Sequence, residues 1–156
     1  MMDENFDIGK FLDLTGYDTP ERRARRKNSE ENTQEFFTPY SIVKRMADKI
    51  SDEDWANPEK TFLEPAAGNG QFVCYIIYRR IISGVDPVTA FKTLYATELM
   101  QDNVIEMKER CLNLLDEMEV TYDKDEIVSI MDHNFVCADF FNWDYRNWKP
   151  EKKALF

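Results

Sequence analysis

The sequence predicts an α/β fold in which helices flank a parallel β-sheet. Short apolar runs at residues 61–63, 94–97 and 135–138 are typical of strands, and longer segments with helical spacing of apolar side chains separate them. Parallel neighbours need connections of this size, so this order of elements favours right-handed crossovers. The expected architecture is half of a doubly wound sheet.

Length and composition limit the chain to one compact domain. It has 156 residues, of which 43% are apolar, enough for one hydrophobic core but too few for two domains. No apolar run approaches the roughly 20 residues of a membrane-spanning helix. The first residues, MMDENFD, lack the basic and apolar regions of a secretory signal. We therefore expect a soluble, cytoplasmic protein without a membrane partner.

The first 35 residues are predicted to form an arm outside the folded domain. Residues 1–20 are acidic, and their apolar side chains Phe6, Ile8, Phe11, Leu12 and Leu14 fit a small docking helix. Residues 21–35 contain almost no apolar side chain, so they cannot bury enough surface to offset ordering entropy. The expected organisation is an arm and linker over residues 1–35 and a folded domain over residues 36–156.

The remaining elements follow from the spacing of apolar residues. A helix capped by Ser41 is expected from residue 39 to 50, and the acidic segment 51–55 is expected to be a loop. The strand at 61–63 leads through a tight turn into a buried helix at 71–82, and 83–87 form a turn before a short helix at 88–93. Helices at 103–118 and 125–131 follow the strand at 94–97.

The last strand, at 135–138, is followed by a segment rich in large aromatic residues. These are Phe140, Phe141, Trp143, Tyr145 and Trp148. They fit either a lid over a ligand or packing against the sheet, and we favour packing because large aromatic side chains mostly serve cores.

Cysteine and histidine give no indication of a metal site or a disulfide. Cys74, Cys111 and Cys137 lie far apart, and His133 is the one histidine of the chain. Each cysteine falls within an apolar stretch, so we expect three buried thiols. His133 stands between polar residues and is expected at the surface.

The net charge of −10 opposes binding to the phosphate backbone of nucleic acid. One basic run is the exception, and it comprises Arg22, Arg23, Arg25, Arg26 and Lys27. Such a run is usually solvated, although it can contact phosphates or the acidic face of a partner. We expect DNA contact only through a partner, or weakly through this run.

Residues suited to a ligand follow each predicted strand. In an open α/β sheet, ligands lie at the carboxyl ends of the strands. The first strand is followed by Glu-Pro-Ala-Ala-Gly-Asn-Gly at 64–70, where Gly68 and Gly70 allow a positive φ and a close backbone approach. Glu98 follows the second strand and suits two ribose hydroxyls. Asp139 and Phe140 follow the third and suit an exocyclic amine and a purine face.

Each of these features alone also fits an ordinary turn or helix cap. Together, in this order and spacing, they favour a cofactor that contains a nucleoside. The dinucleotide pattern Gly-x-Gly-x-x-Gly is not met, because Val73 stands at the third glycine's place, and no phosphate-binding lysine follows. A ligand without phosphates fits better.

Four segments resemble the amino-methylating, adenine-specific DNA methyltransferases of restriction-modification type. They are Glu-Phe-Phe-Thr-Pro at 35–39, Phe-Leu-Glu-Pro-Ala-Ala-Gly-Asn-Gly at 62–70, Ala-Thr-Glu-Leu at 96–99 and Ala-Asp-Phe-Phe at 138–141. The match covers roughly two thirds of the chain in the family's order. Glu64 and Ala67 are mild departures, since the family usually has Asp and often Cys there.

The resemblance implies a Rossmann-like, class I S-adenosylmethionine-dependent fold with strand order 3-2-1, to which a short fourth strand can be added. In the family the aromatic-Thr-Pro element closes over the methionine part of S-adenosylmethionine, the glycine-rich turn holds its amino acid moiety, the acid after the second strand holds the ribose, and the third-strand residues hold adenine. The residues carried over are Phe37, Thr38, Pro39, Glu64, Pro65, Ala66, Gly68, Asn69, Gly70, Glu98, Leu99, Asp139 and Phe140.

The family's catalytic motif is absent from these residues. That motif, an Asp, Asn or Ser followed by Pro-Pro and an aromatic residue, binds the target amine and stacks on the flipped base. No Pro-Pro pair occurs here, so no catalytic residue is assigned. The segment ending at Phe156 resembles the start of the family's fourth strand. We expect a bare edge on the first strand, paired by Leu155 and Phe156 or covered by a second chain, including a second copy of this one.

Three functions remain open. The first is the cofactor half of a DNA adenine methyltransferase that needs a partner chain. The second is a pseudo-methyltransferase that senses or sequesters S-adenosylmethionine or interferes with restriction-modification subunits, which fits a phage or mobile element. A third is another enzyme on the same cofactor, with Glu64, Asp139 or Asp144 as a base. A nucleotide-dependent oxidoreductase is the outside alternative.

Overall fold

The computed structural model describes residues 2–16, 20–21, 24 and 37–152. The five basic residues of the run at 22–27 and the proposed edge-pairing residues Leu155 and Phe156 lie outside this description, as do Glu35 and Phe36 of the first family segment. Within the described residues, no helix is long and apolar enough to cross a bilayer.

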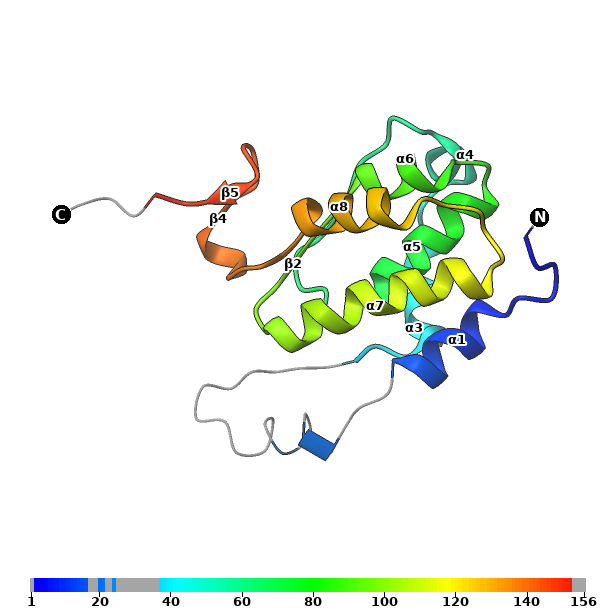
Figure 1. The fold of residues 1–156 in the computed structure, drawn as a ribbon, viewed down its shortest axis with the longest axis horizontal. Coiled ribbons are helices and arrows are strands. Elements are labelled where there is room, and N and C mark those ends of the chain that lie inside the picture. Colours follow the sequence, from blue (N-terminus) through cyan, green and yellow to red (C-terminus); the bar gives the residue numbers. More distant parts are fainter. Residues whose placement is uncertain (1, 17–19, 22–23, 25–36, 153–156) are drawn as a thin grey trace.

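A three-stranded parallel sheet lies at the centre of the fold (Figure 1). It consists of β1 (Phe62–Glu64), β2 (Leu94–Glu98) and β3 (Phe135–Cys137), with β2 in the middle. Phe62 pairs with Leu94, and Ala96 pairs with Phe135. The prediction of an α/β fold with a parallel sheet and this strand order is therefore confirmed.

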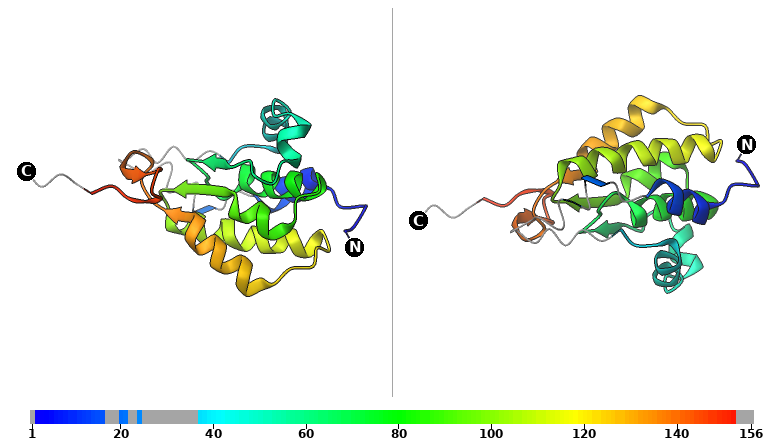
Figure 2. Two further views of the ribbon diagram at one scale, coloured as in Figure 1. Left: turned by 90° about the horizontal axis from the view of Figure 1, so that it is seen from above. Right: turned by 90° about the horizontal axis from the view of Figure 1, so that it is seen from below.

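The connecting helices cover one face of the sheet (Figure 2). The chain crosses the sheet in one direction, from β1 through β2 to β3, and right-handed crossovers then place both connections on the same face. These connections contain α5 (Gln71–Ile82) with α6 (Pro87–Lys92), and α7 (Gln101–Glu117) with α8 (Lys124–Asn134). α5 packs on α7, and α6 packs on α8.

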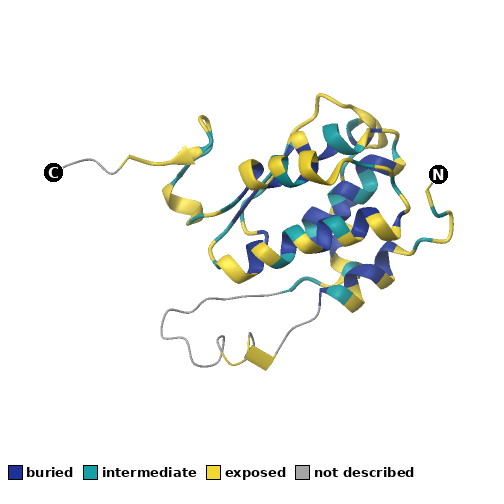
Figure 3. Ribbon diagram, viewed as in Figure 1, coloured by how far each residue is buried: buried dark blue, intermediate teal, exposed yellow. Residues whose placement is uncertain are grey.

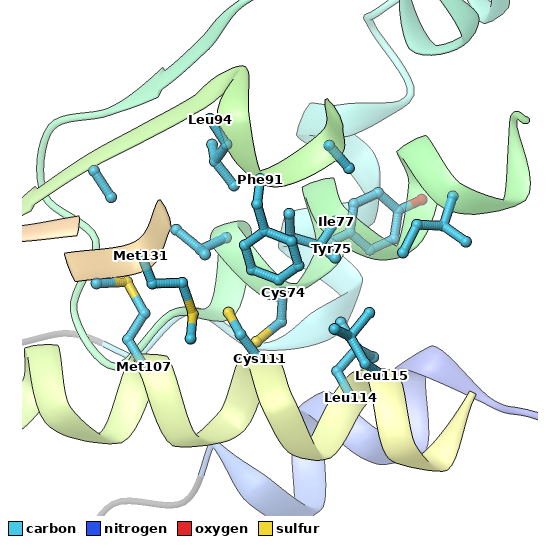
Figure 4. Packing of buried hydrophobic residues seen from close by; sticks show 14 of the residues in the cluster. Cys74, Tyr75, Ile77, Phe91, Leu94, Met107, Cys111, Leu114, Leu115 and Met131 are labelled. Carbon is cyan, nitrogen blue, oxygen red and sulfur yellow. The ribbon is translucent and has the colours of Figure 1, made fainter. Parts of the chain in front are cut away.

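Buried residues gather at the centre of the fold, where the helices meet the sheet (Figure 3). Leu94, Ala96 and Phe135 face the helices and are buried, whereas Leu63, which points to the opposite face, is 49% exposed. The core lies between the sheet and the helices. Figure 4 shows Cys74 of α5 and Cys111 of α7 within it, side by side.

The N-terminal helix belongs to the same core. α1 (Ile8–Thr15) begins after Asp7, whose side chain accepts a hydrogen bond from the Lys10 amide at 3.1 Å. Ile8, Phe11 and Leu12 are buried, and α1 packs against α3 (Tyr40–Ala47) and α5. The sequence predicts this helix as part of an arm, yet its apolar side contributes to the folded domain.

Three local predictions need correction. Pro39, not Ser41, precedes the first turn of α3, because its extended backbone allows the helix to start at Tyr40. The segment expected as a loop contains α4 (Asp52–Ala56), whose start is capped by Ser51 and favoured by acids in the first turn. Cys137 is exposed rather than buried, because it lies at the open end of β3, whereas Cys74 and Cys111 are buried as expected.

The aromatic segment forms a hairpin beside the sheet. A short 3-10 turn, η1 (Phe140–Asn142), leads into β4 (Trp143–Asp144), which pairs antiparallel with β5 (Lys149–Pro150). The Trp148 ring packs edge-on against Tyr95 with centroids 4.9 Å apart, and its Nε1 donates to the carbonyl of His133 at 2.8 Å. The hairpin thus packs on the sheet through Trp148, while Phe141 is 80% exposed.

Candidate cofactor site

The glycine-rich turn joins β1 to α5 in a left-handed backbone conformation. Gly68 has φ 56° and Gly70 has φ 97°, values that side chains with a β-carbon rarely adopt. The Gly70 amide donates to the Ala67 carbonyl at 2.9 Å, and the Ala67 amide donates to the Thr97 carbonyl at 3.0 Å. The turn is therefore closed on itself and fixed to β2.

Two further hydrogen bonds fix the start of this turn. The Glu64 carboxylate accepts from the Ala66 amide at 3.1 Å, and the Pro65 carbonyl accepts from the Thr97 hydroxyl at 2.6 Å. Burial raises the pKa of Glu64, partly offset by the Ala66 hydrogen bond. Glu64 supports the backbone of the turn through this contact.

The Phe-Thr-Pro segment lies against the turn. A β-carbon added to Gly68 would lie 3.8 Å from the Cδ1 atom of Phe37, in ordinary van der Waals contact. The Thr38 carbonyl accepts a hydrogen bond from Gln71 Nε2, in the first turn of α5, at 2.7 Å. Pro39 then starts α3. The structure thus brings together two segments that the sequence separates by about thirty residues.

Glu98 ends β2 with its carboxylate held on both oxygens. Oε1 accepts from the Leu99 amide at 2.9 Å, and Oε2 accepts from Asn103 Nδ2 at 2.8 Å. A carboxylate has about four lone-pair sites, so each of its oxygens can accept more than one donor. Leu99 is 57% exposed beside it.

Asp139 lies at the same edge of the sheet, after β3. The Ala138 amide donates to the Glu98 carbonyl at 3.0 Å, which ties this strand end to Glu98. The Asp139 side chain accepts from the Phe141 amide and from Asn142 Nδ2, both at 3.0 Å. Phe140 follows at 43% exposure, and its ring packs against those of Phe141 and Tyr145 with centroids 4.9 and 5.8 Å apart.

Cys137 is a neighbour of the site that the predicted residues do not include. Its Sγ lies 3.3 Å from the Leu99 carbonyl. Partial desolvation raises the pKa of this exposed thiol, and the nearby charges of Glu98 and Asp102 raise it further. Its position directly before Ala138 and Asp139 is the sequence signal that could have indicated it.

Buried polar residues beneath the turn are also missing from the prediction. Gln71 and Arg110 are buried, and Arg110 donates to the Asn69 carbonyl at 2.9 Å and to Gln71 Oε1 at 2.6 Å. Asn69 is 1% exposed, and its Oδ1 accepts no hydrogen bond from the described residues. No local sequence signal indicates that an arginine in a polar helix is buried.

The residues present fit a nucleoside cofactor without phosphates. The carboxylates of Glu98 and Asp139 suit hydroxyl and amine donors, and would repel a phosphate. Asn69 Oδ1 is a buried acceptor at the turn and has no hydrogen-bond partner among the described residues. Gly68 is half-buried and lies beside the Phe37 ring. These groups come from the carboxyl ends of all three parallel strands.

Comparisons with known proteins do not identify this site. A scan against protein-family models, and searches of curated proteins and of solved structures, found no match. The interpretation of the site therefore depends on the geometry of these residues and on the sequence motifs.

Proposed function

We propose that the chain binds S-adenosylmethionine at the carboxyl edge of its sheet. The observation that carries this proposal is the convergence of the glycine-rich turn, Glu98 and Asp139 at that edge, with Phe37 packed on the turn. In parallel α/β sheets this edge is where ligands bind. The two acids, and a turn that lacks the dinucleotide glycine pattern and a phosphate-binding lysine, favour this cofactor over a dinucleotide.

Each part of the cofactor has a candidate partner. Glu98 would accept the ribose hydroxyls, with Leu99 beside it, and Asp139 would accept the adenine amine, with the Phe140 ring against the purine. The turn from Glu64 to Gly70 and the segment from Phe37 to Pro39 would enclose the methionine part. When bound, the cofactor supplies an electrophilic methyl group, and the protein residues bind and orient it.

We further propose that this is the cofactor half of a DNA adenine methyltransferase. The sequence contains no Pro-Pro motif to bind the target amine and stack on a flipped adenine. A net charge of −10 also disfavours DNA binding by this surface alone. Another polypeptide segment would supply both, and we propose that it docks at the edge of β1 that no described strand covers.

The alternative is a protein that binds the cofactor without turnover, as a sensor or as a competitor of methyltransferase subunits. The methyltransferase half and the binding-only protein would have the same cofactor site. They differ in whether catalytic groups from a second polypeptide give methyl transfer to DNA. They are therefore separated by an activity measurement rather than by a binding measurement.

The test is a methyl-transfer assay with S-adenosylmethionine labelled in its methyl group. The chain alone, with double-stranded DNA, should bind cofactor and transfer no label. Adding a polypeptide that carries the Pro-Pro-aromatic motif and DNA contacts should give labelled adenine, and the same polypeptide with the motif's prolines replaced should not. Label transfer by the chain alone would contradict the need for a partner, and no transfer with any such partner would favour the binding-only function.

A further inference from the structure

Arg110 is a buried cation at the centre of a polar network beneath the candidate site. It is 3% exposed and projects from α7 toward α5 and α1. Its Nε donates to the Thr15 hydroxyl at 3.2 Å, one terminal nitrogen donates to the Asn69 carbonyl, and the other donates to Gln71 Oε1. These acceptors are a hydroxyl, a backbone carbonyl and an amide, and all three are neutral.

A second buried arginine provides a comparison within the same chain. Arg80 is 0% exposed and also donates to neutral oxygens, including the carbonyls of Trp55 at 3.0 Å and Asn57 at 2.6 Å. Those acceptors belong to α4 and the loop after it, away from the strand ends that form the site. Arg80 thus joins structural elements only, whereas one acceptor of Arg110, the Asn69 carbonyl, lies in the glycine-rich turn of the site and a second, Gln71, contacts Thr38.

Two branches lead from Arg110 to the cofactor-binding segments. The direct branch holds the Asn69 carbonyl, within the glycine-rich turn. The indirect branch runs through Gln71, whose Oε1 accepts from Arg110 while its Nε2 donates to the Thr38 carbonyl. One guanidinium therefore sets the relative position of the turn and of the Phe-Thr-Pro segment.

The third contact joins this network to the N-terminal helix. The Thr15 hydroxyl donates to the Phe11 carbonyl at 2.6 Å and accepts from Arg110, so both of its roles are used. The Arg110 guanidinium also lies 5.8 Å from the centre of the Phe11 ring. Since α1 packs on α5, its end is fixed relative to the turn by the same side chain.

We propose that Arg110 is a positioning residue for the cofactor site, acting on the turn through Asn69 and on Thr38 through Gln71. The identity of the ligand in this inference rests on the proposed function. The hydrogen-bond network around Arg110 does not. Burying a cation has a desolvation cost, which its hydrogen bonds to neutral acceptors must offset. Its gain is geometric, because binding segments must be held in place before the ligand arrives.

The first test compares Arg110→Met with Arg80→Met. Calorimetry with S-adenosylmethionine should show at least about tenfold weaker binding for Arg110→Met and a change within about twofold for Arg80→Met. The thermal stability of both variants should fall, because each loses several buried hydrogen bonds. Equal affinities for Arg110→Met and the wild-type chain would overturn the inference.

A second variant separates the two branches without removing the arginine. Gln71→Glu retains an acceptor for Arg110 but has no donor for the Thr38 carbonyl. It should weaken cofactor binding while the Arg110–Asn69 contact and the folded state are kept. Wild-type affinity in Gln71→Glu would contradict a role of the indirect branch through Gln71 in cofactor binding, and would leave only the contact between Arg110 and Asn69.

Amide hydrogen exchange without any ligand tests the network itself. In Arg110→Met the amides of residues 37–40 and 67–72 should exchange faster, whereas in Arg80→Met the increase should lie in residues 52–60. If the wild-type chain bound no S-adenosylmethionine, the proposed function would fail while this exchange pattern could still support the network. Unchanged exchange in Arg110→Met at both segments would overturn the positioning role regardless of ligand.

Discussion

Gly70 lies directly against Met107, and a β-carbon built on Gly70 would be 2.8 Å from the Cγ atom of that side chain. Its φ of 97° is also unfavourable for any residue with a β-carbon. We therefore expect Gly70→Ala to lower the free energy of unfolding by about 2–5 kcal/mol, the sum of backbone strain and overpacking. Urea denaturation followed by circular dichroism measures this change.

Gly84→Ala is the control for that substitution. Gly84 has a similar φ of 96°, yet a β-carbon built there would have nothing within 4 Å. Only the strain should remain, so the loss should be about 1–2 kcal/mol. Equal losses at both positions would show that the contact with Met107 adds nothing.

The charge of Glu64 gives a specific pH dependence. Its pKa in the folded state is raised above the ordinary value of 4.5 by burial. The stability that its neutral form contributes is fully present below that value and is lost as pH rises through the raised pKa. Glu64→Gln keeps the acceptor for the Ala66 amide, so the variant should gain stability relative to the wild-type chain as pH rises above the ordinary pKa of 4.5.

Glu59→Gln makes the same change in net charge at an exposed loop position and serves as the control. Thermal unfolding across the pH range should show the relative gain for Glu64→Gln alone. A relative gain that decreased with rising pH would contradict the burial of this carboxyl group.

The three thiols should differ in reactivity. Cys74 and Cys111 are buried and Cys137 is exposed, so a thiol reagent should label one cysteine in the native chain and three after denaturation. Because the pKa of Cys137 is raised, its labelling should accelerate as pH rises above the ordinary thiol range. Mass spectrometry identifies the site, and labelling of Cys74 or Cys111 under native conditions would contradict the packing of α5 on α7.

In the same labelling experiment, S-adenosylmethionine should slow the reaction of Cys137, since this residue directly precedes the strand end that we propose binds adenine. Adenosine, which is the nucleoside part of S-adenosylmethionine, is the control. The labelling rate with adenosine, in the same buffer without added thiol, shows whether the nucleoside alone protects Cys137. An unchanged rate at saturating cofactor would place the ligand elsewhere.

The open edge of the sheet should be an association surface. Among the described residues, β1 pairs with β2 alone. A cavity of about 300 Å³ lies beside β1, and its lining residues are Thr61, Phe62, Leu63, Tyr95, Tyr145, Arg146 and Trp148. Leu63→Lys should reduce both self-association in sedimentation experiments and binding of a hydrophobic dye. Ile82→Lys, which alters an apolar side chain of similar exposure on α5, should have little effect on either. A stable wild-type monomer that binds no dye would contradict this prediction.

Much of the fold could be predicted because local signals agree with it. Gly70 and Ser83 bound α5 at the residues that the sequence indicates, and apolar runs locate the three strands of the parallel sheet. The helix α4 could not be predicted because five residues are too few to show a helical period, and only Trp55 among them is buried. The packing of α1 into the core depends on partners distant in sequence, which a linear pattern does not show.

The candidate site divides in the same way. Its strand-end residues, such as Glu98 and Asp139, could be identified because their place follows from the order of strands and turns. Arg110 could not, since its burial results from the meeting of α1, α5 and α7. The exposure of Cys137 likewise depends on how the chain leaves the sheet after β3.

Calorimetric titration tests most directly whether the carboxyl edge of the sheet binds the cofactor. The ligands are S-adenosylmethionine and S-adenosylhomocysteine, and the proteins are the wild-type chain, Glu98→Ala and Asp139→Ala. Asp144→Ala is the matched control, because Asp144 caps the hairpin turn through the Arg146 and Asn147 amides, just as Asp139 caps η1. We expect saturable binding in the wild-type chain and in Asp144→Ala, and its loss in both site variants. No binding by the wild-type chain, or equal binding by all four proteins, would show that the cofactor site is not at this edge.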